Sequence, residues 1–187
     1  MKVLYLGPRS TITQFLINKG ENVTQLEHNN ISYINDLSTY DFLISYGYRY
    51  IIGKTVIDLF PERAINLHIS YLPWNRGADP NIWSFVNQTP KGVTIHLLDR
   101  GIDSGDILFQ KEVEFTDKDT LASSYQKLKT EIEHLFMSKW EKLKAGDFSR
   151  TPQIAKGSFH LSQDKGLLNL PDGWNTLITD LPIIPIQ

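Results

Sequence analysis

Short apolar runs separated by polar turns make up the first hundred residues of the chain. Four of these runs have the length and composition of β-strands: Lys2–Leu6 (KVLYL), Asn22–Leu26 (NVTQL), Asp41–Ser45 (DFLIS) and Ala64–His68 (AINLH). A short helix is predicted from Thr11 to Lys19, because Ser10 or Thr11 can cap its start and Gly20 follows its end. A second short helix is predicted within Gly53–Leu59. Strands that alternate with short helices indicate a parallel α/β sheet.

The pattern of apolar positions changes after the fourth run. Asp79 and Pro80 are typical of a helix N-cap and a first helical turn, so a helix is predicted to start there. Two further strands are predicted at Gly92–Asp99 (GVTIHLLD) and Ile107–Phe115 (ILFQKEVEF). The clearest helix follows and is closed by Gly146, because apolar residues recur there at helical spacing: Leu121, Tyr125, Leu128, Ile132, Leu135, Trp140 and Leu143.

These elements predict one α/β domain over residues 1–149, with a Rossmann-like, mostly parallel sheet flanked by helices. After residue 149 the chain changes character, because prolines interrupt short extended pieces: Pro152, Pro171, Pro182 and Pro185. We expect residues 150–187 to form a C-terminal extension that packs on the domain.

Composition limits the classes of function. The 187 residues contain 19 Lys+Arg and 21 Asp+Glu, a net charge of −2, and no basic cluster, so a nucleic-acid partner is not expected. The chain has no cysteine, which excludes disulfides and thiol nucleophiles. Its first apolar run is too short for a secretory signal, and no run approaches a transmembrane length. A cytoplasmic protein without a membrane partner is therefore predicted.

The predicted strand at the fourth run ends in two side chains that suit acyl transfer. Residues i and i+2 of a strand point to the same side, so Asn66 and His68 face one space. Asparagine offers a donor that keeps its charge state, and histidine accepts a proton near neutral pH. A carboxylate would orient the imidazole, and Asp103 and Asp106 in the loop GIDSGDIL are the candidates. We expect this loop, like His68, at the carboxyl ends of the parallel strands.

No serine or cysteine is placed to attack, so the substrate has to bring the nucleophile, such as an amine that attacks a carbonyl carbon. Asn66 would then hold the developing oxyanion, a role worth roughly 3 kcal/mol in comparable sites. His68 would carry the proton of the amine. The plainer alternative is that each residue alone caps a turn or satisfies a local hydrogen bond. The conjunction of these residues with the unusual loop SYLPWNRGADP favours an active site.

Two long motifs carry a resemblance to a known family. The stretch NLHISYLPWNRG resembles the Asn-x-His-x-Ser-x-Leu-Pro-x-x-x-Gly signature of the folate-dependent formyltransferases. The stretch GVTIHLLDRGIDSGDILFQ is similar to the second block of that family, and ISYGYRYII lies where its folate-binding segment is expected. Two long motifs in order are far more specific than one short pattern.

The resemblance implies that Asn66, His68 and Asp103, not Asp106, form the catalytic trio. It also implies N10-formyltetrahydrofolate as the formyl donor, and no metal. Two segments would hold the pteridine ring, at Tyr48, Arg49, Tyr50, Ile51, Ile52, Leu98, Asp99, Gly101 and Ile102. For the isoleucine side chains, plain core packing is an equal alternative.

Differences within the family indicate the acceptor. Relatives that modify tRNA carry a further C-terminal nucleic-acid-binding domain, and purine-pathway relatives carry a glycine-rich phosphate loop where this chain has only GPRS. The chain is most similar to relatives that formylate amino sugars on nucleotide carriers, which share LPWNRGADPN-like, GIDSGDI-like and GSFH-like stretches. The implied acceptor residues are Trp74, Asn75, Arg76, Gly77 and Trp83. Of these, Arg76 would pair with a pyrophosphate, whereas Trp83 either stacks on the substrate or packs in the core.

The expected reaction is direct transfer of the formyl group to a neutral 3- or 4-amino group of a UDP- or dTDP-linked sugar. The product would serve a bacterial surface glycan such as lipopolysaccharide. Asn66 and a protonated His68 would stabilise the oxyanion while Asp103 orients His68.

Several alternatives stay open from the sequence. The chain could be a formyltetrahydrofolate hydrolase, a formyltransferase for another small amine, or an inactive relative that only binds ligand. A Rossmann oxidoreductase is disfavoured because the chain has no Gly-x-Gly-x-x-Gly motif. A homodimer is expected from the habit of the family, and Tyr125, Phe136 and Trp140 belong either to the core or to the dimer interface.

Overall fold

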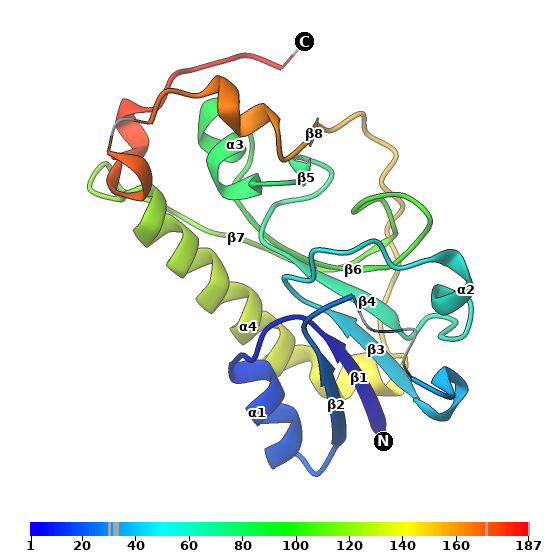
Figure 1. The fold of residues 1–187 in the computed structure, drawn as a ribbon. Helices are drawn as coiled ribbons and strands as arrows, with labels where there is room; N and C mark the ends of the chain where they lie inside the picture. The colour runs from blue at the N-terminus through cyan, green and yellow to red at the C-terminus, as the bar shows by residue number, and fades with distance from the viewer. Residues whose placement is uncertain (30, 32–33, 171, 187) are drawn as a thin grey trace.

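The chain folds around one mixed sheet (Figure 1). The computed structural model describes residues 1–29, 31, 34–170 and 172–186, so Pro171 and Gln187 of the predicted extension lie outside the described residues. Within them, the main sheet has six strands in the spatial order β2-β1-β3-β4-β6-β7. Their bounds are β1 Lys2–Leu6, β2 Asn22–Leu26, β3 Phe42–Ser45, β4 Ala64–His68, β6 Gly92–Leu97 and β7 Ile107–Glu112. A separate ribbon pairs β5 Arg76–Gly77 with β8 Phe159–His160.

The first four strands are parallel, and β1 and β3 lie in the middle of them. In β1, Val3 and Tyr5 pack in the cluster on one face of the sheet, and Leu4 and Leu6 pack in the cluster on the other. None of the four is exposed. A strand covered on both faces is a continuous apolar run rather than an alternating one, which is why this strand was predictable. The predicted Rossmann-like, mostly parallel sheet is confirmed.

β6 runs antiparallel to β4, with His96 opposite Asn66. The carboxyl end of β6 therefore lies beside the amino end of β4. The expectation that the loop after β6 leaves from the carboxyl ends of the parallel strands is wrong for this reason. Residues 98–105 instead fold back toward β4, and the Leu97 N–H closes the loop by donating to the Asp106 carbonyl at 2.9 Å.

The α-helices lie where they were predicted, with the bounds α1 Thr11–Asn18, α2 Lys54–Ile57, α3 Pro80–Val86 and α4 Leu121–Ala145. The Thr120 hydroxyl caps α4 by accepting from the Ser123 N–H. Gly146 ends α4 at φ +71, a left-handed conformation that glycine adopts without steric cost.

Asp79 occupies the predicted N-cap position of α3 but does not cap the helix with its side chain. Its own backbone is left-handed, at φ 49, and its carboxylate makes no hydrogen bond to the first turn. The carboxylate instead pairs with Lys165 of the C-terminal segment at 3.2 Å.

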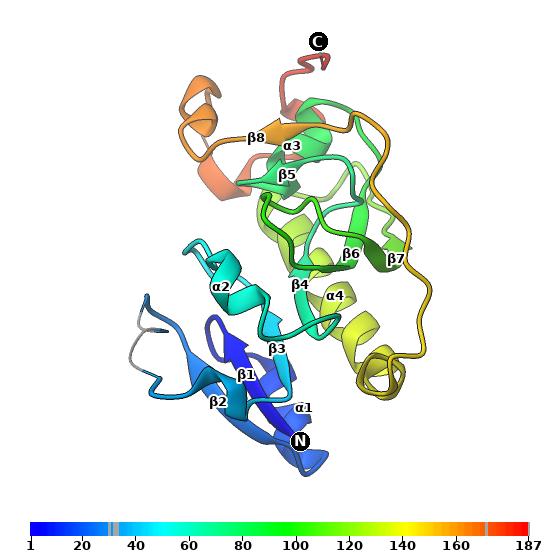
Figure 2. The ribbon, with the colours of Figure 1, turned by 90° about the vertical axis from the view of Figure 1, so that its right-hand side faces the viewer.

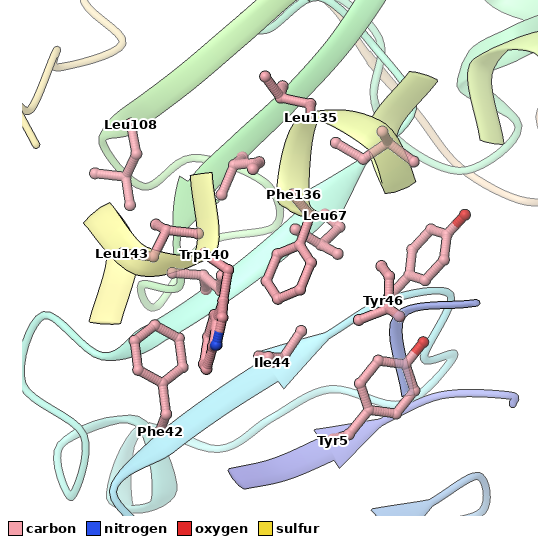
Figure 3. Close-up of a cluster of buried hydrophobic side chains, with 14 of the residues drawn as sticks. Tyr5, Phe42, Ile44, Tyr46, Leu67, Leu108, Leu135, Phe136, Trp140 and Leu143 are labelled. Atoms are coloured by element: carbon pink, nitrogen blue, oxygen red, sulfur yellow. The ribbon is translucent and has the colours of Figure 1, made fainter. Parts of the chain in front are cut away.

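The largest core lies between α4, α1 and one face of the sheet. Figure 3 shows the part of it between α4 and the strands. Phe136 and Trp140 of α4 are fully buried there, and the Trp140 ring meets Phe42 of β3 edge to face at a centroid distance of 5.4 Å. These two aromatic residues therefore belong to the core. Tyr125, near the start of α4, is partly exposed and packs against Trp174 at 5.6 Å.

The segment after α4 runs back along the domain toward α3 (Figures 1 and 2). It is held by a bridge from Thr151 to Ile107, by the pairing of β8 with β5, and by a bridge from Leu177 to Thr120. Leu168 and Leu181 join α3 in a second, smaller core. Short 3₁₀ turns complete the described chain: η2 Leu37–Thr39, η3 Asp164–Leu167, η4 Gly173–Asn175 and η5 Ile178–Asp180. The division of the chain at residue 149 stays a prediction.

Candidate active site

The structure brings Asn66, His68 and Asp103 together. β4 presents the first two on one side of the sheet, and the loop that folds back after β6 delivers the third. The Asn66 Nδ2 donates to Asp103 Oδ1 at 3.0 Å, and His68 Nδ1 lies 3.6 Å from Asp103 Oδ2. Asp103 has φ 51, and non-glycine residues in such conformations cluster at functional sites.

Asp106, the other carboxylate considered from the sequence, is not part of this group. Its side chain pairs with Arg150 at 3.1 Å, and its carbonyl accepts the N–H that closes the loop. Only Asp103 of the two candidates reaches His68.

The Asp103 carboxylate is well stabilised in its ionised form. Its Oδ2 accepts the Gly77 N–H at 2.9 Å, and Gln153 donates to its carbonyl at 2.9 Å. Burial by itself would raise the pKa of Asp103. The neighbouring His68 and His96 and the Gly77 N–H more than offset burial and hold this pKa well below its ordinary value.

His68 is buried, and its Nε2 lies 3.1 Å from the Asn75 carbonyl. A carbonyl can only accept, so this hydrogen bond assigns the proton of the neutral ring to Nε2 and leaves Nδ1 as the acceptor. Burial lowers the pKa of His68, and the charge of Asp103 offsets this only in part. The resting ring is therefore neutral, so the protonated His68 expected at the oxyanion stage would gain its proton during the reaction.

His96 is a further residue of the site that the sequence analysis did not single out. It is 1% exposed, and its Nδ1 lies 2.8 Å from the Leu97 carbonyl, so Nδ1 carries the proton and Nε2 accepts from Asn66 at 3.2 Å. The Asn66 amide thus gives one hydrogen to Asp103 and the other to His96. The sequence feature that could have indicated His96 is that it is the only ionisable side chain in the strand GVTIHL.

The loop between β4 and α3 is held in place by the GSFH segment, residues 157–160. The Asn75 N–H donates to Ser158 Oγ at 2.8 Å, and β5 pairs with β8. Gly77 has φ +87, and a Cβ there would overlap the His160 carbonyl. Glycine is therefore required for this pairing, which also aims the Gly77 N–H at Asp103.

The residues predicted for the acceptor side fall into two groups. Asn75 is fully buried and donates to Thr89 at 2.7 Å, so its side chain supports the loop, and the carbonyl of the partly exposed Trp74 accepts from Ser70. Arg76 and Trp83 line a pocket of about 430 Å³.

The first segment predicted to hold the pteridine, Tyr48–Ile52, follows β3. Its Ile51 is 86% exposed and Tyr50 is also exposed, whereas Ile52 packs against the cluster that contains Leu4 and Leu6 of β1. Nothing in the described chain hydrogen-bonds to the backbone groups of residues 49–52, which therefore remain available to a ligand.

The second predicted segment, the loop that begins at Leu98, shows the same division. Leu98 packs in the cluster with Ile52, whereas Ile102 beside Asp103 is exposed. The Asp99 carboxylate accepts the Gly101 N–H at 3.0 Å and so shapes its own turn.

Two further findings concern the described residues only. None of their histidine, cysteine, aspartate and glutamate side chains form a group of three or more that could hold a metal ion. None of their helices has the length and apolar character needed to cross a membrane.

Comparison with known proteins gives a family and several relatives. A model of the formyl transferase family matches residues 8–139. The curated methionyl-tRNA formyltransferase of Thermodesulfovibrio yellowstonii is 33% identical over 138 residues, which is 72% of this chain and 44% of that protein. The chain thus spans less than half the length of this relative.

Solved structures match over more of their length. The formyltransferase PseJ from Anoxybacillus kamchatkensis, in complex with UDP-4,6-dideoxy-4-formamido-L-AltNAc and tetrahydrofolate, is 45% identical with a TM-score of 0.88 and 96% coverage of both chains. A sugar N-formyltransferase from a Shewanella species is 25% identical with a TM-score of 0.77, covering 95% of this chain and 84% of that one. The chain belongs to the formyl transferase family, as its motifs indicated.

Proposed function

We propose that this member of the formyl transferase family moves a formyl group from N10-formyltetrahydrofolate to the amino group of a nucleotide-linked amino sugar. The observation that carries the proposal is the buried contact of Asn66 and His68 with Asp103, made by the two motifs that resemble the family signature. The likeness to PseJ, which extends over 96% of both chains, supports the sugar acceptor.

A tRNA acceptor has less support. The likeness to the methionyl-tRNA formyltransferase covers 44% of that protein, and the net charge of the present chain is −2. Proteins that bind nucleic acid usually present a basic surface to the phosphates.

The two segments predicted to hold the folate fit a flat heteroaromatic ring. They expose the apolar side chains of Tyr50, Ile51 and Ile102, and residues 49–52 offer backbone donors and acceptors without partners in the described chain. Apolar walls with a few aimed polar groups are typical of ligand sites. When bound, the donor supplies a formyl carbon whose oxygen gains negative charge as the amine attacks.

The three catalytic residues have separate tasks. The Asn66 amide donates to the developing oxyanion, for which it exchanges one of its two internal acceptors, Asp103 or His96. His68 Nδ1 takes the proton that the attacking amine loses and returns it to the departing nitrogen, so the enzyme ends in its starting state. Asp103 stabilises the imidazolium that forms in between.

The test is a formyl-transfer assay over UDP- and dTDP-linked amino sugars, with tetrahydrofolate release as the readout. We expect release only when an amino sugar is present, and its loss in His68→Ala. His134→Ala is the matched control, because His134 is an exposed histidine on α4. Release without any sugar would replace the proposal with a hydrolase, and no release with any acceptor would leave a binding protein.

Four finer expectations are part of the proposal, of which the homodimer and the glycan product rest on the family resemblance and the other two on the sequence pattern. They are a cytoplasmic location, a homodimer, a product that enters a bacterial surface glycan, and a boundary near residue 149 between the catalytic domain and its extension. Size-exclusion chromatography with light scattering checks the second, with a mass twice that of the chain as the expected result.

A further inference from the structure

The segment after α4 lies against the loop that delivers Asp103 to the site. Thr151 of this segment bridges Ile107, where the loop ends, and the backbone N–H of each residue donates to the carbonyl of the other at 2.9 Å. Two residues later, Gln153 donates from Nε2 to the Asp103 carbonyl at 2.9 Å and to the Gly105 carbonyl at 2.8 Å. The side chain of Gln153 therefore ties the interior of the loop to the C-terminal segment.

The two carbonyls determine which way the Gln153 amide faces. A carbonyl only accepts, so the amide nitrogen lies toward the loop and the amide oxygen lies on the other side. Oε1 is buried and has no hydrogen-bond partner among the residues that the structure describes. An unpartnered buried oxygen costs free energy, which the two bonds from Nε2 offset. A methionine would fill the same space without that cost, so the arrangement favours a role for the two donated bonds.

These two bonds stabilise a part of the loop that the backbone supports little. No backbone N–H of the described chain donates to the carbonyl of Asp103 or of Gly105. Asp103 is left-handed, at φ 51, a conformation that a non-glycine residue keeps only when its surroundings hold it there. Gly105 is closely packed, because a Cβ there would overlap the Leu97 carbonyl. Gln153 therefore supplies the hydrogen bonds that hold the strained backbone of Asp103 in place.

The position of Asp103 matters because both of its carboxylate oxygens face other members of the trio. Oδ1 accepts from Asn66 at 3.0 Å, and Oδ2 lies 3.6 Å from His68 Nδ1. A displacement of about 1 Å can cost an enzyme a large part of its rate. Gln153 bonds to the backbone of Asp103 and not to its carboxylate, so its effect on the chemistry passes through the position of Asp103.

We propose that Gln153 is a positioning residue, which holds the loop so that the Asp103 carboxylate reaches Asn66 and His68 together. The inference rests on the proposed function and adds a residue that acts through the trio without belonging to it. It also gives the segment after α4 a task in catalysis, because that segment carries the donor that fixes the loop.

Titration of His68 by NMR in the ligand-free full chain tests the inference without relying on formyl transfer. Burial lowers the pKa of His68, the charge of Asp103 raises it, and His96 lowers it. Gln153→Met keeps the length of the side chain and removes both donors, so the carboxylate should move away and the His68 pKa should fall, as it should in Asp103→Asn. Gln25→Met is the matched control, because Gln25 also donates to a backbone carbonyl, at 3.0 Å, but from β2 at the opposite edge of the sheet. It should leave the His68 pKa unchanged.

Steady-state kinetics provides the second readout. Gln153→Met should lower kcat for formyl transfer roughly 10-fold, the loss expected for one or two hydrogen bonds, with KM for the amino sugar unchanged. Added to Asp103→Asn, the same substitution should lower kcat less than about 2-fold further, because the charge that Gln153 positions is already gone. Gln153→Asn withdraws the amide by one methylene and should act in the same direction, so it remains informative should Gln153→Met lower the melting temperature.

The outcomes separate this inference from the proposed function. If the wild type formylates an amino sugar, an unchanged His68 pKa and an equal loss of kcat with and without Asp103→Asn would make Gln153 a structural residue alone. The inference would then be wrong and the function would stand. If the His68 pKa falls in Gln153→Met but the wild type formylates no amino sugar, the positioning role stands and the proposed function is wrong.

Discussion

The proposed catalytic trio and the neighbouring pocket that Arg76 and Trp83 line differ in whether their buried polar atoms have hydrogen-bond partners within the described protein. At the trio, Asp103 accepts from Asn66 on one carboxylate oxygen and from the Gly77 N–H on the other, so the protein itself supplies donors to both oxygens. In the pocket, donors and acceptors such as Trp83 Nε1 and Asn87 Oδ1 are buried without partners among the residues that the structure describes.

Under the proposed function, this difference separates groups that act in catalysis from groups that recognise the substrate. Groups that stabilise charge during a reaction act best when the fold has already oriented them, because no reorganisation is then needed at the transition state. Groups that recognise a substrate gain most when only the substrate can satisfy them. Changes at the trio should therefore act on kcat, and changes in the pocket should act on KM.

The largest effect is expected from removing a reacting group. Asn66→Ala and His68→Ala should each lower kcat for formyl transfer roughly 100- to 1,000-fold, because the oxyanion donor or the proton acceptor is lost. Steady-state kinetics measures this, with calorimetry of UDP as the second readout. An unchanged kcat with weakened UDP binding would mean that the two regions do not divide their tasks as proposed.

Gly77→Ala should damage both regions at once, because Gly77 belongs to both. The added Cβ overlaps the His160 carbonyl in the ribbon beside the pocket, and the shift moves the N–H that holds Asp103. We expect kcat to fall and KM to rise, each by roughly 10-fold, with a loss of about 1–3 kcal/mol in the free energy of unfolding.

Gly20→Ala is the matched control for Gly77→Ala. It has a similar positive φ of +81, but no atom lies within 4 Å of its added Cβ. Its kinetics should match the wild type, which isolates the effect of the overlap from that of backbone strain. Equal kinetic losses in both variants would contradict the proposed link between the regions.

His96→Leu should have a moderate effect confined to kcat. The leucine cannot accept the second Asn66 hydrogen, so the amide loses part of its orientation, and one such bond is worth about 1 kcal/mol, or roughly 5-fold in rate. His96→Gln retains an acceptor and should recover part of kcat. A fall in both variants without any difference between them would assign His96 a packing role alone.

The smallest effect is a shift in pH dependence. Burial lowers the pKa of His68, so the neutral form persists as pH falls, and kcat/KM should decline only below the ordinary histidine value of about 6.5. Asp103→Asn removes the negative charge that partly opposes the lowering of the His68 pKa. The decline of kcat/KM on the acid side should therefore move to still lower pH, in addition to an overall loss of rate from the substitution. A limb that moves upward would show that Asp103 does not act on His68 by its charge.

Much of the fold could be predicted from local patterns. The apolar runs at β1 and β3 were recognisable because strands buried on both faces have few polar positions, and α4 was recognisable from its helical spacing and from Gly146. Asn66 and His68 were predictable as a pair because alternate strand residues share a side. These features depend on residues close together in the chain, where spacing alone determines geometry.

Only the tertiary structure decided how distant segments meet. The antiparallel course of β6 placed His96 opposite Asn66 and required the loop to fold back before Asp103 could reach the site. The return of the C-terminal segment brought His160 onto Trp83 and residues 184–186 onto the pocket. Strand direction and the pairing of remote segments depend on the packing free energy of the whole chain. They cannot be predicted from a local pattern of residues, because the contacts involved join segments that are far apart in the sequence. The sequence by itself predicted that Asn66, His68 and Asp103 belong to one site, and the fold determined what each of them contacts.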